Sequence, residues 1–252
     1  MTTLVTGGTG TLGRQVVRRL VESGHEVRVA SRSARPEGNR HPFEWARVDY
    51  RTGEGLASAL SGARTVVHCA TSFLGKEVAL AEAVSSAARR AGCSHLVYIS
   101  IVGVDRIPLG YYRTKRDAEE VFAGSGVGWS VLRATQFHDL CARVMALLAR
   151  SPVVPCPRGM RVQPIDVRDV AVRLAAIAEG EPVGRAADIG GPEVFTFREL
   201  ALAYLAAKGR RGKLVSVGVP GATAKAYRAG HNLVPGEPYG RITFRSFLDQ
   251  PG

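Results

Sequence analysis

The glycine-rich segment TLVTGGTGTLGRQVV, residues 3–17, limits the possible fold of this chain more than any other feature. Its glycines satisfy two spacings at once, Gly7-x-x-Gly10-x-x-Gly13 and Gly8-x-Gly10-x-x-Gly13. A strand-like run precedes the glycines, and an amphipathic, helix-like run follows them. In this context one glycine allows a tight turn, one lets the backbone approach a pyrophosphate, and one lets the helix pack on the strand. The segment predicts a dinucleotide-binding turn, the alternative being a tight turn that binds no ligand.

Strand-like and helix-like runs alternate over the first half of the chain. Apolar runs that predict strands cover residues 3–6, 26–30, 46–48, 64–70, 95–100 and 129–134. Helices are predicted between them at residues 11–23, 54–60, 76–91 and 111–123. This alternation indicates βαβ units with right-handed crossovers, and the continuous apolar strands indicate a sheet covered on both faces. The predicted fold class is α/β, a Rossmann-type doubly wound parallel sheet.

The second half of the chain has a less regular pattern. Helices are predicted at residues 136–150, 165–180 and 196–209. The stretch 151–163 carries three prolines and is predicted to be a loop. Asp166 is a candidate N-cap of the second of these helices, and Thr196 with Glu199 makes a capping-box pattern at the third.

The change of pattern after the last predicted strand of the first half indicates two parts. Residues 1–135 are expected to form the cofactor-binding core. Residues 136–252 are expected to form a small C-terminal substrate lobe packed on the carboxyl edge of the sheet, the two together making a single domain.

Composition is that of an ordinary globular protein, with 45% hydrophobic and 22% charged residues. No apolar run approaches the roughly 20 residues of a membrane helix, so no membrane association is expected. Met1 leads almost directly into a strand, without room for a signal peptide, so we expect a cytoplasmic location. The four cysteines (Cys69, Cys93, Cys141 and Cys156) are far apart and the histidines are dispersed, so neither a disulfide frame nor a metal site is expected.

The formal net charge of +12 raises the question of nucleic-acid binding. The basic residues are spread over the whole chain, and no run of five or more occurs. Arginine far outnumbers lysine, which is typical of a GC-rich bacterial coding bias, and aromatic residues are not interleaved with the basic ones. We therefore expect a solvated basic surface and no nucleic-acid partner.

The end of the second predicted strand bears on the choice of dinucleotide. It reads Ala30-Ser31-Arg32-Ser33 and lacks the carboxylate that holds the ribose 2′-hydroxyl of NAD. The guanidinium of Arg32 can instead pair with a 2′-phosphate, and Arg14 can add a second positive contact. The sequence favours NADP(H) over NAD(H), the alternative being that Arg32 is an ordinary surface arginine.

Several stretches together resemble the NmrA-like group of atypical short-chain dehydrogenase/reductases. In chain order they are TGGTGTLG, VRVASR, VDY, HLVYISIVGVD, YYRTKRDAEEVFAGSG, WSVLRATQF, VQPIDVRDVA and GGPEVFTFREL. The resemblance runs from Thr3 past Leu200, which makes it far more specific than the glycine loop alone.

The resemblance implies where a cofactor binds. The implied contacts are Asp49 at the adenine with Tyr50 beside it in sequence, Ala70 and Thr71 at the central ribose, and Thr135 and Phe137 beside the nicotinamide. Within the glycine loop, the assigned contacts are Gly7, Thr9, Gly10, Thr11, Leu12, Gly13 and Arg14. Asp49 suits an exocyclic amine, with a turn residue as the alternative, and the small residues after the fourth strand leave room for a ribose or simply pack.

The catalytic pattern that the resemblance implies is Tyr-x-x-x-Lys, which Tyr111 and Lys115 match. One helical turn places both side chains on one face. In such pairs the lysine holds the nicotinamide ribose and its charge lowers the tyrosine pKa, so that the tyrosine passes a proton to a carbonyl oxygen. The alternative is that Tyr111 and Tyr112 are aromatic packing at a helix start.

Ser100 is the candidate hydroxyl that would polarise the carbonyl, but Ile101 stands where active relatives often carry a second hydroxyl. His138 is a further candidate proton donor, or else a surface or helix-end histidine.

Three functions are open on these residues. The favoured one is an NADP(H)-dependent oxidoreductase, monomeric or homodimeric, acting on a small, fairly apolar carbonyl, enone or quinone-like substrate. Ile101 motivates the alternative, a non-catalytic NADP(H) sensor of the NmrA type. A nucleotide-sugar epimerase or dehydratase ranks last, because the residues after the sixth strand look too few for its larger C-terminal domain.

Overall fold

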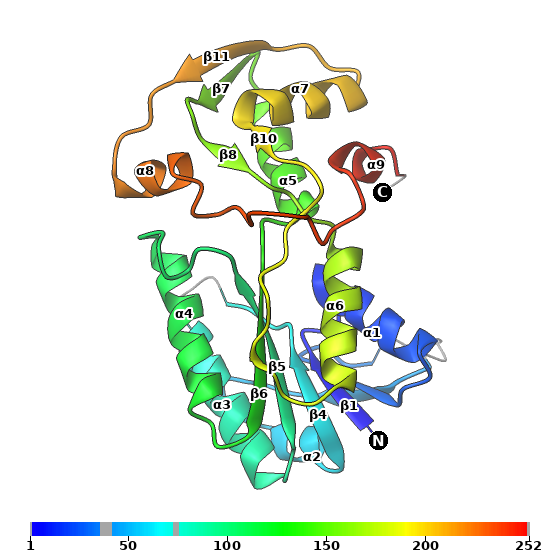
Figure 1. The fold of residues 1–252 in the computed structure, drawn as a ribbon. Coiled ribbons are helices and arrows are strands. Elements are labelled where there is room, and N and C mark those ends of the chain that lie inside the picture. Colours follow the sequence, from blue (N-terminus) through cyan, green and yellow to red (C-terminus); the bar gives the residue numbers. More distant parts are fainter. Residues whose placement is uncertain (1, 36–41, 73–75, 251–252) are drawn as a thin grey trace. The chain divides into compact units, whose positions relative to one another are not determined.

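The computed structural model describes residues 2–35, 42–72 and 76–250 (Figure 1). Contacts group the chain into two units. Unit 1 comprises Met1–Ser100, Arg113–Leu132 and Ala171–Ala187, and unit 2 comprises Ile101–Tyr112, Arg133–Val170 and Asp188–Gly252. Both units are discontinuous in sequence, so this grouping differs from the predicted division at residue 135.

Unit 1 is built on a central sheet. Its strands are β1 (Thr2–Thr6), β2 (Val27–Ser31), β3 (Glu44–Arg47), β4 (Ala63–His68), β5 (His95–Ile101), β6 (Gly128–Ala134) and β9 (Gly184–Arg185). Within the described residues their spatial order is β3-β2-β1-β4-β5-β6-β9, and the β1–β2, β2–β3, β1–β4, β4–β5 and β6–β9 pairs are parallel. The order reverses between β1 and β4, as in a doubly wound Rossmann sheet, which confirms the predicted fold class.

Helices cover both faces of this sheet. They are α1 (Thr11–Glu22), α2 (Leu56–Leu60), α3 (Glu77–Arg90), α4 (Gly110–Ala123) and α6 (Val167–Glu179). Residues of α2, α3 and α4 share one apolar core with the strands, whereas α1 and α6 lie together on the other face (Figure 1). Leu4, Val66 and Leu96 are fully buried in that core, and each such side chain contributes about 1.5–3 kcal/mol on burial.

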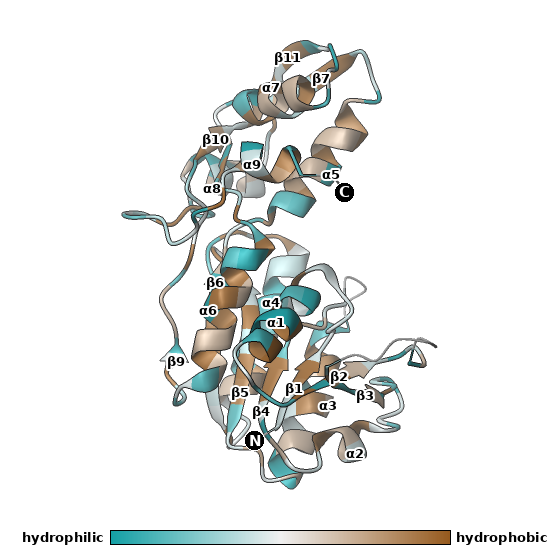
Figure 2. Cartoon of the chain, turned by 90° about the vertical axis from the view of Figure 1, so that its right-hand side faces the viewer, coloured by the Kyte–Doolittle hydropathy of each residue, from teal (hydrophilic) through white to brown (hydrophobic). Residues whose placement is uncertain are grey.

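The hydropathy of the elements follows from this layering. Figure 2 shows β1, β4 and β5 mostly in brown, while α1 carries a hydrophilic and a hydrophobic side. Strands buried on both faces need apolar residues throughout, whereas a covering helix needs them on one stripe only.

Unit 2 holds the remaining elements. They are α5 (His138–Leu148), β7 (Val153–Pro157), β8 (Arg161–Val162), β10 (Phe195–Thr196), α7 (Phe197–Ala207), β11 (Lys213–Val217), α8 (Ala222–Arg228) and α9 (Phe244–Leu248). Strand β7 pairs in parallel with β11, and β8 pairs antiparallel with β10.

The prediction that residues 151–163 form a loop is wrong, because this stretch contains β7 and β8. Pro155 and Pro157 fit the strand because the backbone nitrogens of alternate residues in β7 point away from its partner, β11. Arg158 donates its N–H to Val217 O at 2.9 Å, so the intervening residues need no amide hydrogen on that side.

Two predicted helix starts are confirmed. Thr196 accepts a hydrogen bond from Glu199 N at 3.2 Å, and Glu199 accepts one from Thr196 N at 2.7 Å, which completes a capping box at α7. Asp166 accepts a hydrogen bond from Arg168 N at 2.9 Å ahead of α6.

Candidate cofactor site

The turn between β1 and α1 requires glycine at two positions for steric reasons. Gly7 has a φ of +65°, and a Cβ atom there would lie 2.6 Å from Ala70 N. A Cβ on Gly13 would collide with the carbonyl oxygen of Gly7, so helix and turn can pack this closely only without a side chain. Gly10 N donates to Gly7 O at 2.9 Å, which closes the turn.

Gly10 differs from these two glycines in its surroundings. A Cβ atom on Gly10 would meet only Gly7 O, at 3.2 Å, among the described residues. This contact is tight but involves one atom, so packing within the protein constrains Gly10 less than Gly7 or Gly13. The open backbone here fits the close approach of a pyrophosphate.

The N-terminus of α1 offers hydrogen-bond donors to an anion. Gly10 is its N-cap, in an extended conformation, and no side chain caps the helix. The amides of Thr11, Leu12 and Gly13 have no acceptor within the helix, because the first turn never does. Together with the helix dipole, these amides suit a phosphate group, and Arg14 lies exposed beside them.

The structure places Arg32 exposed just beyond β2, near Asp49. The Asp49 carboxylate accepts a hydrogen bond from Arg51 N at 2.8 Å. This bond, with the positive charges of Arg51 and Arg32, holds the pKa of Asp49 below its usual value. Asp49 is therefore a turn residue, as in its alternative interpretation. Its negative charge lies near Arg32.

Tyr50 lies under the glycine loop. Its hydroxyl donates to Ala30 O at 3.5 Å and lies near Gly7 and Thr6, and its ring packs on the core. Burial raises the pKa of Tyr50, so the phenol stays neutral. Tyr50 therefore packs against Thr6 and Gly7, where β1 ends and the glycine loop begins.

The end of β4 is fixed beside the same loop. Thr6 Oγ1 lies 2.8 Å from His68 Nδ1 and 3.4 Å from Ala70 N, which donates to it. His68 is buried against the rings of Tyr98 and Phe122. Burial lowers the pKa of His68 to about 3, so the imidazole is neutral and the position of Ala70 is set by neutral hydrogen bonds.

Lys115 lies in a buried ion pair that the sequence analysis missed. Its Nζ atom is 2.9 Å from Glu77 Oε1 and donates to Ile99 O at 2.9 Å. The other Glu77 oxygen, Oε2, accepts hydrogen bonds from Thr71 Oγ1 at 3.0 Å and Ser72 N at 2.7 Å. Glu77 thus joins two predicted cofactor contacts, Thr71 and Lys115.

Two predicted hydroxyl groups stand without a hydrogen-bond partner in the described part of the chain. Ser100 Oγ, in unit 1, and Thr135 Oγ1, in unit 2, are both buried and unpaired. Buried hydroxyls are ordinarily hydrogen-bonded. Each of these two therefore has an unused capacity to bind a ligand atom.

The two tyrosines at the start of α4 have different surroundings. Tyr112 is buried, and its hydroxyl lies 3.1 Å from the hydroxyl of Tyr227 and accepts a bond from Gln136 Nε2 at 3.5 Å. Tyr111 is half-buried and packs on an apolar cluster that includes Ile107. Tyr111 and Lys115 lie one turn apart on α4, while the Lys115 ammonium is bonded to Glu77 and Ile99.

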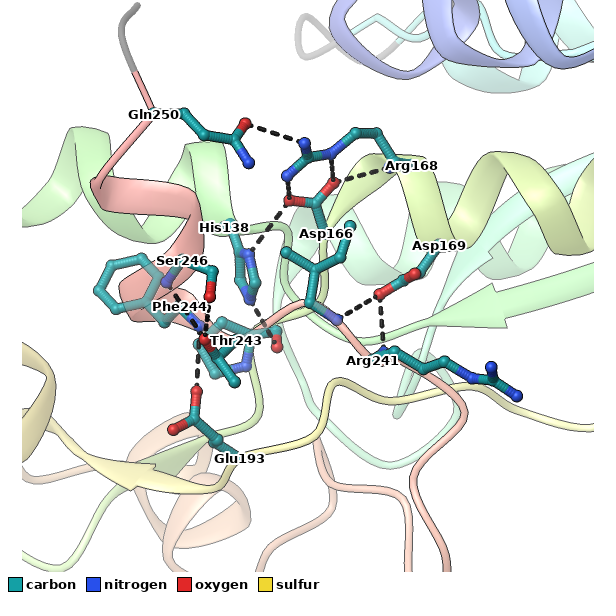
Figure 3. Close-up of polar contacts among 12 residues, drawn as sticks. His138, Asp166, Arg168, Asp169, Glu193, Arg241, Thr243, Phe244, Ser246 and Gln250 are labelled. Carbon is teal, nitrogen blue, oxygen red and sulfur yellow. Dashed lines mark hydrogen bonds and ion pairs between the residues drawn. The ribbon is translucent and has the colours of Figure 1, made fainter.

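Phe137 and His138 start helix α5. Phe137 is the half-buried N-cap, and His138 is fully buried, with Nε2 3.0 Å from Pro164 O and Nδ1 3.6 Å from a carboxylate oxygen of Asp166 (Figure 3). Of the alternative interpretation, a surface or helix-end histidine, the helix end is confirmed and the surface position is wrong, because Phe244 and Phe247 pack on the ring at 5.4 and 5.3 Å between centroids.

Two further carboxylates of unit 2, those of Asp169 and Glu193, bind the backbone of residues 241–244. Asp169 Oδ2 accepts from Arg241 N and Ile242 N at 2.8 and 3.0 Å, and Glu193 accepts from Phe244 N at 3.0 Å (Figure 3). Both carboxylates are thus hydrogen-bonded to backbone amides. The arrangement in unit 2 therefore holds α9 in place.

Over residues 2–35, 42–72 and 76–250, no group of three or more His, Cys, Asp or Glu side chains is arranged to hold a metal ion. None of the helices in those ranges is long and apolar enough to span a membrane.

Comparison with known proteins adds to this geometry. A family model described as NAD(P)H-binding matches residues 7–177. The (4-alkanoyl-5-oxo-2,5-dihydrofuran-3-yl)methyl phosphate reductase of Streptomyces griseus is 30% identical over 223 residues, covering 87% of this chain and 78% of that protein. The NAD(P)H azoreductase of Xenophilus azovorans is 29% identical over 220 residues, covering 85% of this chain and 76% of that protein.

A solved structure supports the fold assignment. The NADPH-dependent quinone oxidoreductase of Escherichia coli, in complex with NADPH, superposes with a TM-score of 0.83 at 19% identity, covering 98% of each chain. The likeness at this identity concerns the fold alone. The family model and the two reductases go further, and show that this chain belongs to the NAD(P)H-binding family of atypical short-chain dehydrogenase/reductases and is an NAD(P)H-dependent oxidoreductase.

Proposed function

We propose that the protein is an NADP(H)-dependent oxidoreductase that transfers hydride to or from a small, fairly apolar carbonyl, enone or quinone-like substrate. The observation that carries the proposal is the open turn at Gly10, followed by an uncapped helix N-terminus, with exposed Arg32 at the end of the next strand. The named activities of the relatives, reduction of a (4-alkanoyl-5-oxo-2,5-dihydrofuran-3-yl)methyl phosphate and of azo compounds, support the reaction class.

The chain's own residues divide the binding task. The amides of Thr11, Leu12 and Gly13 would bind the pyrophosphate, with Gly7, Thr9 and Gly10 shaping the turn and Arg14 adding charge. Asp49 would lie at the adenine, and Ala70 and Thr71 at the central ribose. Thr135 and Phe137 would border the nicotinamide, the group that supplies the hydride when the cofactor is bound.

Three side chains would act on the reacting groups. Lys115 would bind the nicotinamide ribose through an N–H that Glu77 and Ile99 leave unused. The unpaired Ser100 hydroxyl would donate a hydrogen bond to the substrate oxygen, and Tyr111 would pass it a proton. We place Tyr111 in this role because it stands four residues before Lys115, the spacing of the Tyr-x-x-x-Lys pattern.

The preference for NADP(H) rests on Arg32. A guanidinium can pair with a 2′-phosphate in a bidentate, charge-assisted manner. The end of β2 carries Ser31 and Arg32 in place of the Asp or Glu that would bind a ribose 2′-hydroxyl. Asp49, which lies near Arg32, already uses one oxygen for its own turn.

The test is a titration of the purified protein with NADPH and NADH, followed by cofactor fluorescence. We expect the wild-type protein to bind NADPH more tightly, and Arg32→Ser to lose about tenfold in NADPH affinity, the scale of one charge-assisted hydrogen bond, with little effect on NADH. Arg18→Ser removes the same charge from an exposed site on α1 and should change neither. Equal affinities for the two cofactors would refute the preference.

The substrate class is tested with a panel. Loss of NADPH absorbance would be followed with small apolar ketones, enones, quinones and azo compounds. We expect turnover within the first three classes. Cofactor binding without turnover of any panel member would refute the proposed substrate class and leave the binding assignment standing.

A further inference from the structure

The buried carboxylate of Glu77 connects two segments that lie far apart in sequence. One is the end of β4 with Thr71 and Ser72, and the other is Lys115 on α4. We propose that Glu77 is a positioning residue for the cofactor, which fixes the Lys115 ammonium and the residues after β4 in the geometry that binds the ribose. This inference rests on the proposed function, in which both segments contact the cofactor.

The hydrogen bonds of Glu77 use both of its oxygens. Oε1 accepts from Lys115 Nζ and from the Tyr98 hydroxyl, each at 2.9 Å, and Oε2 accepts from Thr71 Oγ1 and Ser72 N. Four donors converging on one carboxylate fix its position and, through it, the positions of all four donors. Only an ionised carboxylate accepts at all four sites, because an amide presents an NH₂ group at one of its two ends.

Burying the charges of Glu77 and Lys115 costs desolvation free energy, which their attraction only partly offsets. The Glu77 side chain is 1% exposed and that of Lys115 is 5% exposed. Apolar residues of similar volume often replace a buried ion pair without loss of stability. A pair that links a ribose-binding lysine to the segment after β4 has a use beyond stability, because cofactor binding depends on the relative placement of the two.

The lysine remains able to bind a ligand. Its Nζ atom contacts the Glu77 carboxylate, Ile99 O and the Tyr98 ring, whose centroid lies 4.4 Å away. Within the described residues, two of its three N–H groups therefore have oxygen acceptors. Burial lowers the pKa of Lys115, and the negative charge of Glu77 opposes that shift, which favours an ammonium ion that can donate to a hydroxyl.

The experiment measures NADPH affinity by cofactor fluorescence, so that it does not depend on an identified substrate. We expect Glu77→Gln to bind NADPH about tenfold or more weakly, since one charge-assisted hydrogen bond contributes on that scale. The matched control is Glu82→Gln, which removes the same charge from an exposed position of α3 and should bind as the wild type does.

A second readout separates positioning from general support of the fold. The titratable groups that interact with Lys115 are Glu77, Cys69, Glu119 and His68. Without the Glu77 charge, the lysine should lose its proton at lower pH, so the NADPH affinity of Glu77→Gln should begin to fall at a lower pH than that of the wild type. Merely structural damage would leave the pH profile parallel to that of the wild type.

The outcomes are distinct. Folded Glu77→Gln protein with wild-type NADPH affinity and pH profile overturns the inference. If Glu77→Gln does not fold, Tyr98→Phe carries the test, because it removes one hydroxyl from the carboxylate; about threefold weaker NADPH binding supports the inference and unchanged binding overturns it. A wild-type protein that does not bind NADPH refutes the proposed function itself.

Discussion

The Nζ atom of Lys115 lies 2.9 Å from Oε1 of Glu77, and both side chains are shielded from solvent. Removing either partner leaves the other as an uncompensated buried charge, so Lys115→Met and Glu77→Gln should each lower the free energy of unfolding by about 3–5 kcal/mol. The double variant should lose clearly less than the sum. Urea unfolding followed by circular dichroism measures all four proteins, and additive losses would show that the two charges do not interact.

Gly10 and Gly13 should respond differently to alanine. A Cβ atom on Gly10 needs Gly7 O to shift by a few tenths of an ångström, so Gly10→Ala should cost about 1 kcal/mol, while the added methyl obstructs the pyrophosphate. Gly13→Ala should lower stability as well as binding, because its Cβ collides with Gly7 O. Thermal unfolding with and without NADPH separates the two effects, since bound cofactor raises the midpoint. A normal NADPH-induced shift in Gly10→Ala would contradict the pyrophosphate assignment.

Tyr111 and Tyr112 provide a matched pair of phenylalanine variants. If Tyr111 donates the proton, Tyr111→Phe should lower kcat by about 10²–10⁴-fold, with NADPH affinity unchanged. Tyr112→Phe loses the hydrogen bonds to Tyr227 and Gln136 and should retain most of the turnover. Steady-state kinetics with an accepted substrate decides between the tyrosines, and the reverse pattern would transfer the role to Tyr112.

Asp166 should make the protein sensitive to acid. Burial alone would raise the pKa of Asp166, but the hydrogen bonds from Arg168, at 2.7 and 2.8 Å, outweigh it and hold the pKa well below its ordinary value. Because the folded-state pKa is depressed, the stabilisation is complete above the unfolded value of about 4 and is lost as the pH falls through the folded value.

Asp166→Asn tests this dependence. The substitution should lower stability at neutral pH by about 3 kcal/mol and flatten the acid limb of the stability curve. Denaturant unfolding across the acid range gives both quantities, with Asp117→Asn, an exposed change on α4, as the control. An unchanged slope in acid would mean that Asp166 does not carry the dependence.

Periodicity predicted unit 1 well because its strands are long, apolar and separated by covering helices. It failed at β7 because that strand exists only through pairing with β11, which lies more than fifty residues further on. Prolines usually indicate a loop. Only the register with β11 shows that the proline nitrogens, which lack a hydrogen, point away from that strand.

The candidate site was predicted where the backbone itself carries the chemistry. Gly7, Gly10 and Gly13 are recognisable because their spacing reflects a turn. Glu77 gave no such signal, since a glutamate in the first turn of a helix is ordinarily an exposed partner of the helix dipole. Its burial depends on contacts with Lys115 and Thr71, and a local sequence pattern does not predict a contact with a residue as distant in sequence as Lys115.

The late position of β9 in the chain has a consequence for synthesis on the ribosome. Strand β6 ends at Ala134 and its outer neighbour begins only at Gly184, so the hydrogen-bonding edge of β6 stays unpaired while fifty residues are added. At typical rates of translation this lasts roughly 3–10 s, long enough for the nascent edge to meet other chains. Slow codons between β6 and β9 would lengthen that exposure and should favour aggregation.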